Sequence, residues 1–105
     1  MPEIFKLEVY VPKTHVEEVK NALFAAGAGR IGNYDRCCWQ IPGTGQFRPL
    51  DGSTPHIGQK HKTETVEEFK IELVFEGSRK TQIIEALKKS HPYETPAYQF
   101  WKIET

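Results

Sequence analysis

Apolar and polar residues alternate along three stretches of the chain, the pattern typical of strands with a buried face. The stretches are residues 5–11, 66–75 and 97–104. The first two each have one apolar face, formed by Phe5, Leu7, Val9 and Val11 and by Phe69, Ile71, Leu73 and Phe75. The last stretch differs, because it carries large apolar side chains on both faces: Tyr98 and Phe100 on one, Trp101 and Ile103 on the other. We therefore expect three main strands, the last of them covered on both faces.

Two further stretches have the apolar spacing of helices. The first follows Thr14, which stands three residues before Glu17, the spacing that lets each side chain satisfy an amide at a helix start. It is predicted to end near Gly27, because glycine permits the backbone conformation in which helices stop. The second helix is predicted to be capped by Ser78 and to end near Ser90.

The middle of the chain combines turn residues with short apolar runs. Residues 37–50 predict two short strands around a turn at Gly43, Thr44 and Gly45. Residues 51–64 hold almost no apolar side chains and many turn residues, which predicts an exposed loop.

The order of elements is strand, helix, hairpin, strand, helix, strand. It predicts the α+β class: a ferredoxin-like βαββαβ sandwich with a hairpin extension over residues 34–50, built as a single domain from residues 1–105. Both helices would pack on the same face of the sheet. The Trp101 face of the last strand would then need another cover, and self-association would supply it.

Charge and cysteine content narrow the classes of partner. The 105 residues include 14 Lys or Arg and 14 Asp or Glu, so we expect neither nucleic acid nor a membrane as a partner. The charged N-terminal residues lack an apolar run of signal-peptide length, which predicts a cytoplasmic protein. Cys37 and Cys38 are adjacent and would point to opposite faces of a strand, so we interpret them as structural thiols; reactive or metal-binding thiols are the alternative.

The segment "HPYETP" is the strongest candidate for a special role. Pro92 and Pro96 restrict the residues before them to extended geometry, so the segment is interpreted as a joint that leads the chain from helix to last strand. On that interpretation His91→Ala would leave the fold intact. The alternative is that His91, Tyr93 and Glu94 contact a ligand, since histidine titrates near neutrality and glutamate offers charge.

Other candidates carry weaker signals. Gly43, Thr44 and Gly45 lack the lysine and helix of a phosphate loop, and "GAGRIG" follows a predicted helix rather than joining a strand to a helix as dinucleotide binding requires. The glycines of both stretches are interpreted as turn residues, although exposed amides near Arg30 could hold an anion. His56 and His61 have a zinc-like spacing, but no second pair completes a tetrahedral set. No nucleophile has a visible base and orienting partner, so we predict no catalytic residue.

Residues 27–59 closely resemble the domain inserted between the two halves of some Nif-three-like proteins, often called GTP cyclohydrolase type 2. The match rests on "GAGRIGNY", Gly43-Thr44-Gly45 with Phe47, Pro55 with Ile57-Gly58, and "HPYE", and it extends across nearly the whole chain. The segment "HPYETP" also resembles the one before the last strand of CutA proteins. The insert is similar in fold to CutA and to the PII signalling proteins, which assemble as trimers.

The resemblance implies a CutA/PII-like domain without the flanking halves, and a homo-oligomer, with a trimer favoured. The metal site of the parent proteins lies in those halves, so the resemblance implies no metal, cofactor or cyclohydrolase activity here. We expect a small oligomeric module that binds a small molecule or a partner protein in a regulatory or sensor-like role, with any ligand in a cleft between subunits near the hairpin and His91. Two alternatives stay open: a CutA-type protein that responds to divalent metal ions, and a small hydrolase with an intersubunit site.

Overall fold

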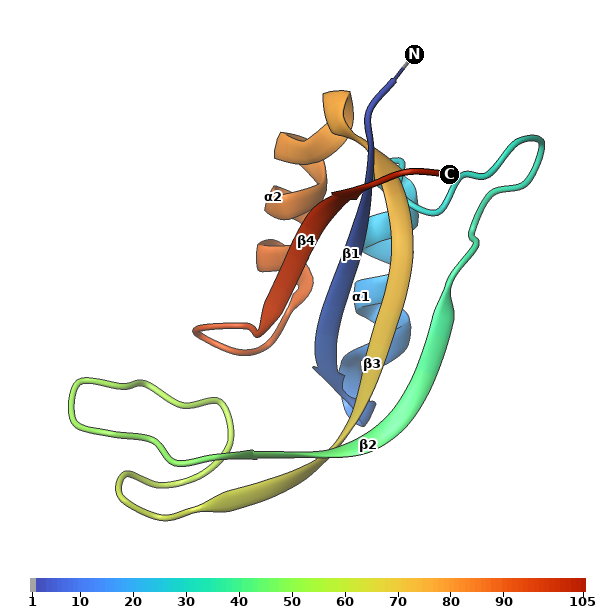
Figure 1. Ribbon diagram of the computed structural model, residues 1–105. Coiled ribbons are helices and arrows are strands. Elements are labelled where there is room, and N and C mark those ends of the chain that lie inside the picture. The colour runs from blue at the N-terminus through green and yellow to red at the C-terminus, as the bar shows by residue number, and fades with distance from the viewer. Residues whose placement is uncertain (1) are drawn as a thin grey trace.

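The computed structural model describes residues 2–105, and its helices and strands follow the predicted order (Figure 1). The elements are β1 (Ile4–Pro12), α1 (Val16–Ala25), β2 (Trp39–Phe47), β3 (Glu64–Glu76), α2 (Lys80–Ser90) and β4 (Tyr98–Ile103). A single 3-10 turn precedes each helix, at Lys13–His15 and at Gly77–Arg79.

The strands form one antiparallel sheet in the order β2-β3-β1-β4. Both helices lie on the same face of this sheet, as the ribbon shows (Figure 1). The predicted ferredoxin-like α+β fold is therefore confirmed. We call the opposite face of the sheet, which no helix covers, the open face.

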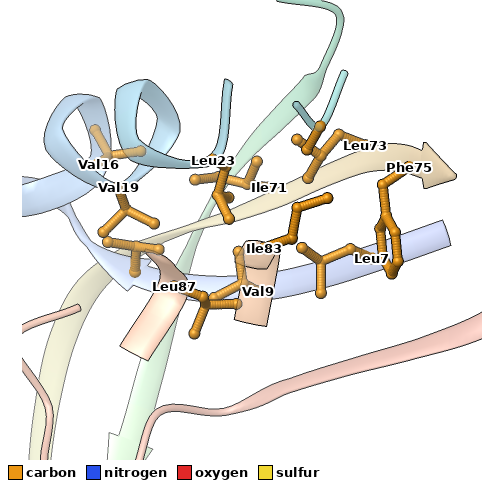
Figure 2. Packing of buried hydrophobic residues seen from close by; sticks show 12 residues of the cluster. Leu7, Val9, Val16, Val19, Leu23, Ile71, Leu73, Phe75, Ile83 and Leu87 are labelled. Atoms are coloured by element: carbon orange, nitrogen blue, oxygen red, sulfur yellow. The ribbon is translucent and has the colours of Figure 1, made fainter. Parts of the chain in front are cut away.

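The core lies between the helices and the covered face of the sheet (Figure 2). Its fully or almost fully buried side chains come from the alternating positions of β1 and β3 and from one stripe of each helix: Leu7, Val9, Val11, Ile71, Leu73, Phe75, Val16, Val19, Leu23, Ile83 and Leu87. Tyr98 and Phe100 of β4 pack against the same cluster. Burying apolar surface contributes roughly 25 cal/mol per Å², so this layer is the main source of stability.

The two helices end as predicted but begin differently. At the end of α1, Gly27 has φ +107°, the Gly27 amide bonds to the Phe24 carbonyl and the Ala28 amide bonds to the Leu23 carbonyl, which together form a Schellman motif. Neither helix start has a side-chain cap, so the capping roles predicted for Thr14 and Ser78 are wrong. The 3-10 turns replace them, because their tighter bonding occupies the first helical amides.

The local hairpin predicted around Gly43-Thr44-Gly45 is also wrong. These residues lie inside β2, which runs without a turn from Trp39 to Phe47 and pairs with β3 throughout. The two cysteines precede β2 rather than belonging to it, and no disulfide joins them. Glycine in a strand often marks a close approach of another group, and that is the case at Gly45, as shown below.

The predicted hairpin extension is formed by β2, β3 and the long loop between them. β1 pairs with β3 only from Glu68 onward, so residues 64–67 pair with β2 alone and project beyond the body. We call residues 44–67 the arm; its loop, residues 48–63, contains no strand or helix, in agreement with the predicted loop over 51–64. The arm bends beneath the segment that precedes β4 and gives the chain its elongated dimensions of 48 × 25 × 22 Å (Figure 1).

Candidate functional site

The segment between α2 and β4, residues 91–97, is held against the body by His91. This side chain is only 5% exposed. Its Nε2 atom donates a hydrogen bond to the Tyr10 carbonyl oxygen (2.7 Å), and its Nδ1 atom accepts one from the Tyr93 amide (3.1 Å). Both ring nitrogens are therefore occupied by backbone groups, which supports the interpretation of this segment as a joint.

The same two bonds define the protonation of His91. A carbonyl oxygen can only accept and an amide N–H can only donate, so the ring is neutral with its proton on Nε2. Burial lowers the pKa of His91 below its ordinary value, and the hydrogen bond to Tyr10 offsets part of that effect. His91 thus has no free nitrogen for a ligand and serves to position the residues that follow it.

Tyr93 links the joint to the base of the arm. Its hydroxyl donates to Oε2 of Glu68 on β3 (2.8 Å). Burial and this bond to a carboxylate raise the pKa of the Tyr93 hydroxyl. Gly45 makes room for the pair, because a Cβ atom at position 45 would overlap the Glu68 carboxylate. The sequence singled out Gly45 as a turn residue, and that interpretation is wrong. Glycine fits this position because it has no side chain to overlap Glu68.

Four further contacts fix the arm, through the end of β2 and through its loop, beside the joint and the 3-10 turn at Lys13–His15. The Thr54 amide donates to Oε2 of Glu94 (3.0 Å). The Phe47 and Tyr93 rings lie 5.8 Å apart between centroids. The His56 ring stands 6.4 Å from that of Tyr93 and 5.5 Å from that of His15. The arm is therefore folded back onto the body rather than extended freely into solvent.

A groove with a volume of about 410 Å³ lies between the arm and the joint, and we call it the arm groove. Its apolar lining comes from Phe47, Pro49, Leu50, Pro55, Ile57 and Ala97. Its polar lining includes Glu68, Tyr93, Glu94, His56 and Arg48. The volume falls within the range of pockets that hold small molecules, and the mixture of apolar walls with a few polar groups is typical of them.

The other predicted site residues lie elsewhere. Gly43 and Thr44 line a second, smaller hollow with Lys13 and Glu67. Arg30 is far from both, because the neighbouring Gly29 amide bonds to the Val74 carbonyl, six residues along β3 from Glu68, or about 20 Å at the rise of a strand. The structure therefore brings together Tyr93, Glu94 and Gly45, and separates them from Arg30.

Sequence reasoning missed Glu68, Phe47 and His56 as members of the groove. Glu68 stands in a charged run at the start of β3, where it resembles an ordinary solvated residue. Only the bend of the arm, which follows from tertiary packing, brings these side chains to the joint. The resemblance that singled out Phe47, Pro55 and Ile57 as motif positions was the one available signal.

Replacing Gly45 with alanine is expected to displace the Glu68 carboxylate and to break its bond with Tyr93. We expect a loss of about 1–3 kcal/mol in the free energy of unfolding, typical of an overpacked position, measured by urea denaturation. Gly43→Ala is the matched control, because a Cβ atom there would meet no atom within 4 Å. Equal stabilities of the two variants would contradict the packing role of Gly45.

The open face has apolar margins and a charged centre. Lys6 pairs with Glu72 (2.6 Å), and Lys70 pairs with Glu8 (3.0 Å) and Glu72 (3.7 Å). The hydrogen bond from Lys6 lowers the pKa of Glu72, and the one to Glu8 raises the pKa of Lys70. Strand pairing places apolar side chains of all four strands on this same face: Ile4, Trp39, Ile41, Val74, Trp101 and Ile103. Trp101 is 42% exposed and Trp39 74% exposed.

Two other sequence-based expectations concern metals and membranes. Within residues 2–105, no three His, Cys, Asp or Glu side chains converge in a way that would hold a metal ion. His61 bonds to Asp51 and His56 packs beside His15, so the two histidines of zinc-like spacing have different neighbours. No helix among the described residues has the length and apolar character needed to cross a membrane.

No family profile matches the chain. A GTP cyclohydrolase 1 type 2 homolog of Bacillus subtilis (strain 168) is 48% identical over 99 residues, 94% of this chain but 26% of that protein. The homolog of Halalkalibacterium halodurans is 46% identical over 100 residues, 95% of this chain and 27% of that protein. The chain thus spans about a quarter of the length of these curated relatives.

Solved structures agree with the sequence comparison. A Bacillus cereus protein related to NIF3 is 40% identical, with a TM-score of 0.85 over 99% of this chain and 26% of that one. CutA from Xylella fastidiosa is 18% identical, with a TM-score of 0.69 over 97% of this chain and 85% of that one, which establishes likeness of fold. The chain therefore has the CutA fold and corresponds to the CutA-like segment of NIF3-related proteins, the resemblance that its sequence indicated.

Proposed function

We propose that residues 1–105 form a single CutA/PII-like module that self-associates and binds a small molecule or a partner protein, in a regulatory or sensor-like role in the cytoplasm. The arm groove carries this proposal. It has the size and lining of a small-molecule pocket, and its walls come from β2, the loop of the arm, β3 and the joint. A ligand bound there would contact both the arm and the body. It would thereby change the surface that the arm offers to another subunit or to a partner protein.

A thermal-shift screen of metabolites, nucleotides and divalent ions tests the binding proposal. A ligand that prefers the folded chain stabilises it by about 2.7 kcal/mol at a concentration one hundred times its Kd. For a domain of this size that corresponds to a rise in Tm of at least about 10 °C. Ala97→Phe, which places a ring at the exposed Ala97 position in the groove, is expected to abolish the shift without unfolding the chain. A shift of equal size in this variant would move the ligand elsewhere.

Self-association is proposed through the open face, and a trimer is favoured. The apolar margin of that face supports it, because these side chains stay partly exposed in the single chain. The charged centre is compatible with burial, since its two lysines and two glutamates are already paired with one another. The resemblance to CutA and PII proteins is what favours three subunits over two.

A response to divalent metal ions is the second candidate, favoured by the likeness to a protein named as the periplasmic divalent cation tolerance protein CutA of Archaeoglobus fulgidus, which has a TM-score of 0.68. Copper or zinc would then raise Tm, and a chelator would reverse the effect. Stabilisation by an organic metabolite alone would favour the groove over this candidate. Turnover of a compound that binds would instead support the hydrolase alternative.

A further inference from the structure

The charged residues that line the arm groove indicate the chemical class of its ligand. We infer that this ligand is an organic cation: an ammonium or guanidinium group attached to an apolar or aromatic body. This inference rests on the proposed binding function and specifies the chemical class of ligand. It is drawn from the carboxylates and rings of the groove. The ligand's cationic group would sit at Glu68 and Glu94, and its body would lie between the arm and the joint.

The two carboxylates of the groove lack a cationic partner within the described chain. Neither Glu68 nor Glu94 lies within 4.0 Å of a Lys, Arg or His nitrogen in the ion pairs of residues 2–105. Each accepts a hydrogen bond from a neutral donor instead: the Tyr93 hydroxyl for Glu68 and the Thr54 amide for Glu94. Such bonds orient a carboxylate but leave its negative charge uncompensated. The half-buried setting of Glu68 would strengthen its attraction for a cation relative to that of a fully solvated carboxylate.

Aromatic rings stand in the same groove. Phe47 and Tyr93 are tilted against each other, and the His56 ring lies beside Tyr93. The negative face of an aromatic ring attracts a cation, and aromatic rings pack edge-to-face or offset against other rings. Leu50 and Ile57 extend the apolar wall. Carboxylates and rings in one hollow are thus complementary to a charged head on an apolar body.

Among the described residues, Arg48 is the one permanent cation that lines the groove, and it raises the alternative of an anionic ligand. It is exposed, and it forms no ion pair with Glu68 or Glu94 in the described chain. Against two carboxylates it leaves the groove with an excess of negative charge. An anionic ligand would have to bind at Arg48 while facing both glutamates, and like charges in a groove cost free energy.

Three probes with the same phenyl body and different heads test the inference: 2-phenylethylamine as the cation, 2-phenylethanol as the neutral compound, and 3-phenylpropionate as the anion. Binding to the full chain is followed by the NMR shifts of the Gly45, Thr54 and Tyr93 amides. We expect the amine to bind at least about tenfold more tightly than the other two. We also expect its affinity to fall as salt is added, because the pairing is electrostatic.

Charge-neutral variants locate the interaction. Glu68→Gln should weaken amine binding about tenfold, a change of about 1.4 kcal/mol. If Glu68→Gln fails to fold, Glu94→Gln still tests the inference, because it changes an exposed side chain. Glu85→Gln, an exposed position on α2, is the matched control and should have no effect.

The outcomes separate this inference from the proposed function. Equal affinity for all three heads, or tighter binding of 3-phenylpropionate, would overturn the cationic assignment and leave the groove as a binding site. Unchanged amine affinity in both glutamine variants would also overturn it. If no probe moves the groove amides and the metabolite screen gives no shift that Ala97→Phe removes, the groove is not a binding site and both proposals fail.

Discussion

Replacing His91 with alanine is expected to lower the free energy of unfolding by about 3 kcal/mol. The ring is almost completely buried, so its removal leaves a cavity. The Tyr10 carbonyl and the Tyr93 amide also lose their partners. This replaces the expectation from sequence that the fold would tolerate alanine at this position, because the sequence did not reveal the burial. Urea denaturation measures the loss, and His56→Ala, which truncates an exposed ring, should change stability by less than about 1 kcal/mol.

His91 should also make stability depend on pH. Burial lowers its pKa in the folded chain below the ordinary value of 6.5 that it has when unfolded. Between those two values the unfolded chain binds more protons than the folded chain, so stability is highest above about pH 6.5 and falls as the pH drops. The slope contributed by one such group is at most about 1.4 kcal/mol per pH unit.

His91→Gln isolates this effect. Its amide nitrogen can donate to the Tyr10 carbonyl as Nε2 does, yet it does not titrate. We expect this variant to retain more stability than His91→Ala and to show a shallower fall between about pH 7 and about pH 5. An identical pH profile in wild type and His91→Gln would assign the pH dependence to other groups.

Placing a charge at position 101 is expected to abolish the proposed self-association and to give monomers. Light scattering of the wild type should give a mass near three times the 12.1 kDa of one chain. Trp101 lies on the open face directly opposite Lys6 of β1. In Trp101→Glu the new carboxylate would lose its hydration in the assembly, at a cost of several kcal/mol, while remaining solvated and close to Lys6 in the monomer.

Two controls make this prediction specific. Trp101→Phe keeps an aromatic ring on the open face and should stay assembled. Thr81→Glu adds the same charge at an exposed position on α2, on the covered side of the sheet, and should also stay assembled. A wild-type mass of one chain would refute self-association, and a mass of two chains would retain it but remove the trimer. A trimeric Trp101→Glu variant would place the contact on another surface.

The sequence by itself determined the layers of this fold. Alternation at Leu7, Val9, Ile71 and Leu73 and helical spacing in the two crossovers depend on local periodicity, because a side chain's face follows from its position in a strand or helix. Gly27 ended α1 for an equally local reason, its freedom to adopt positive φ. The short motifs around the glycines and "HPYE" indicated the similarity to NIF3-related proteins, which is confirmed in sequence and structure, and the likeness to CutA proteins, which is confirmed for the fold.

Only the tertiary structure decided what the functional candidates do. Gly43 and Gly45 resemble turn residues locally, but pairing with β3 holds them in a strand, since a long ladder outweighs weak local preferences. His91 is a buried anchor because Tyr10, 81 residues earlier, supplies the carbonyl that it binds. Glu68 meets Tyr93 only because the arm bends beneath the joint. Periodicity reports which face a side chain occupies, whereas a site depends on contacts between distant segments, and these form only when the chain folds.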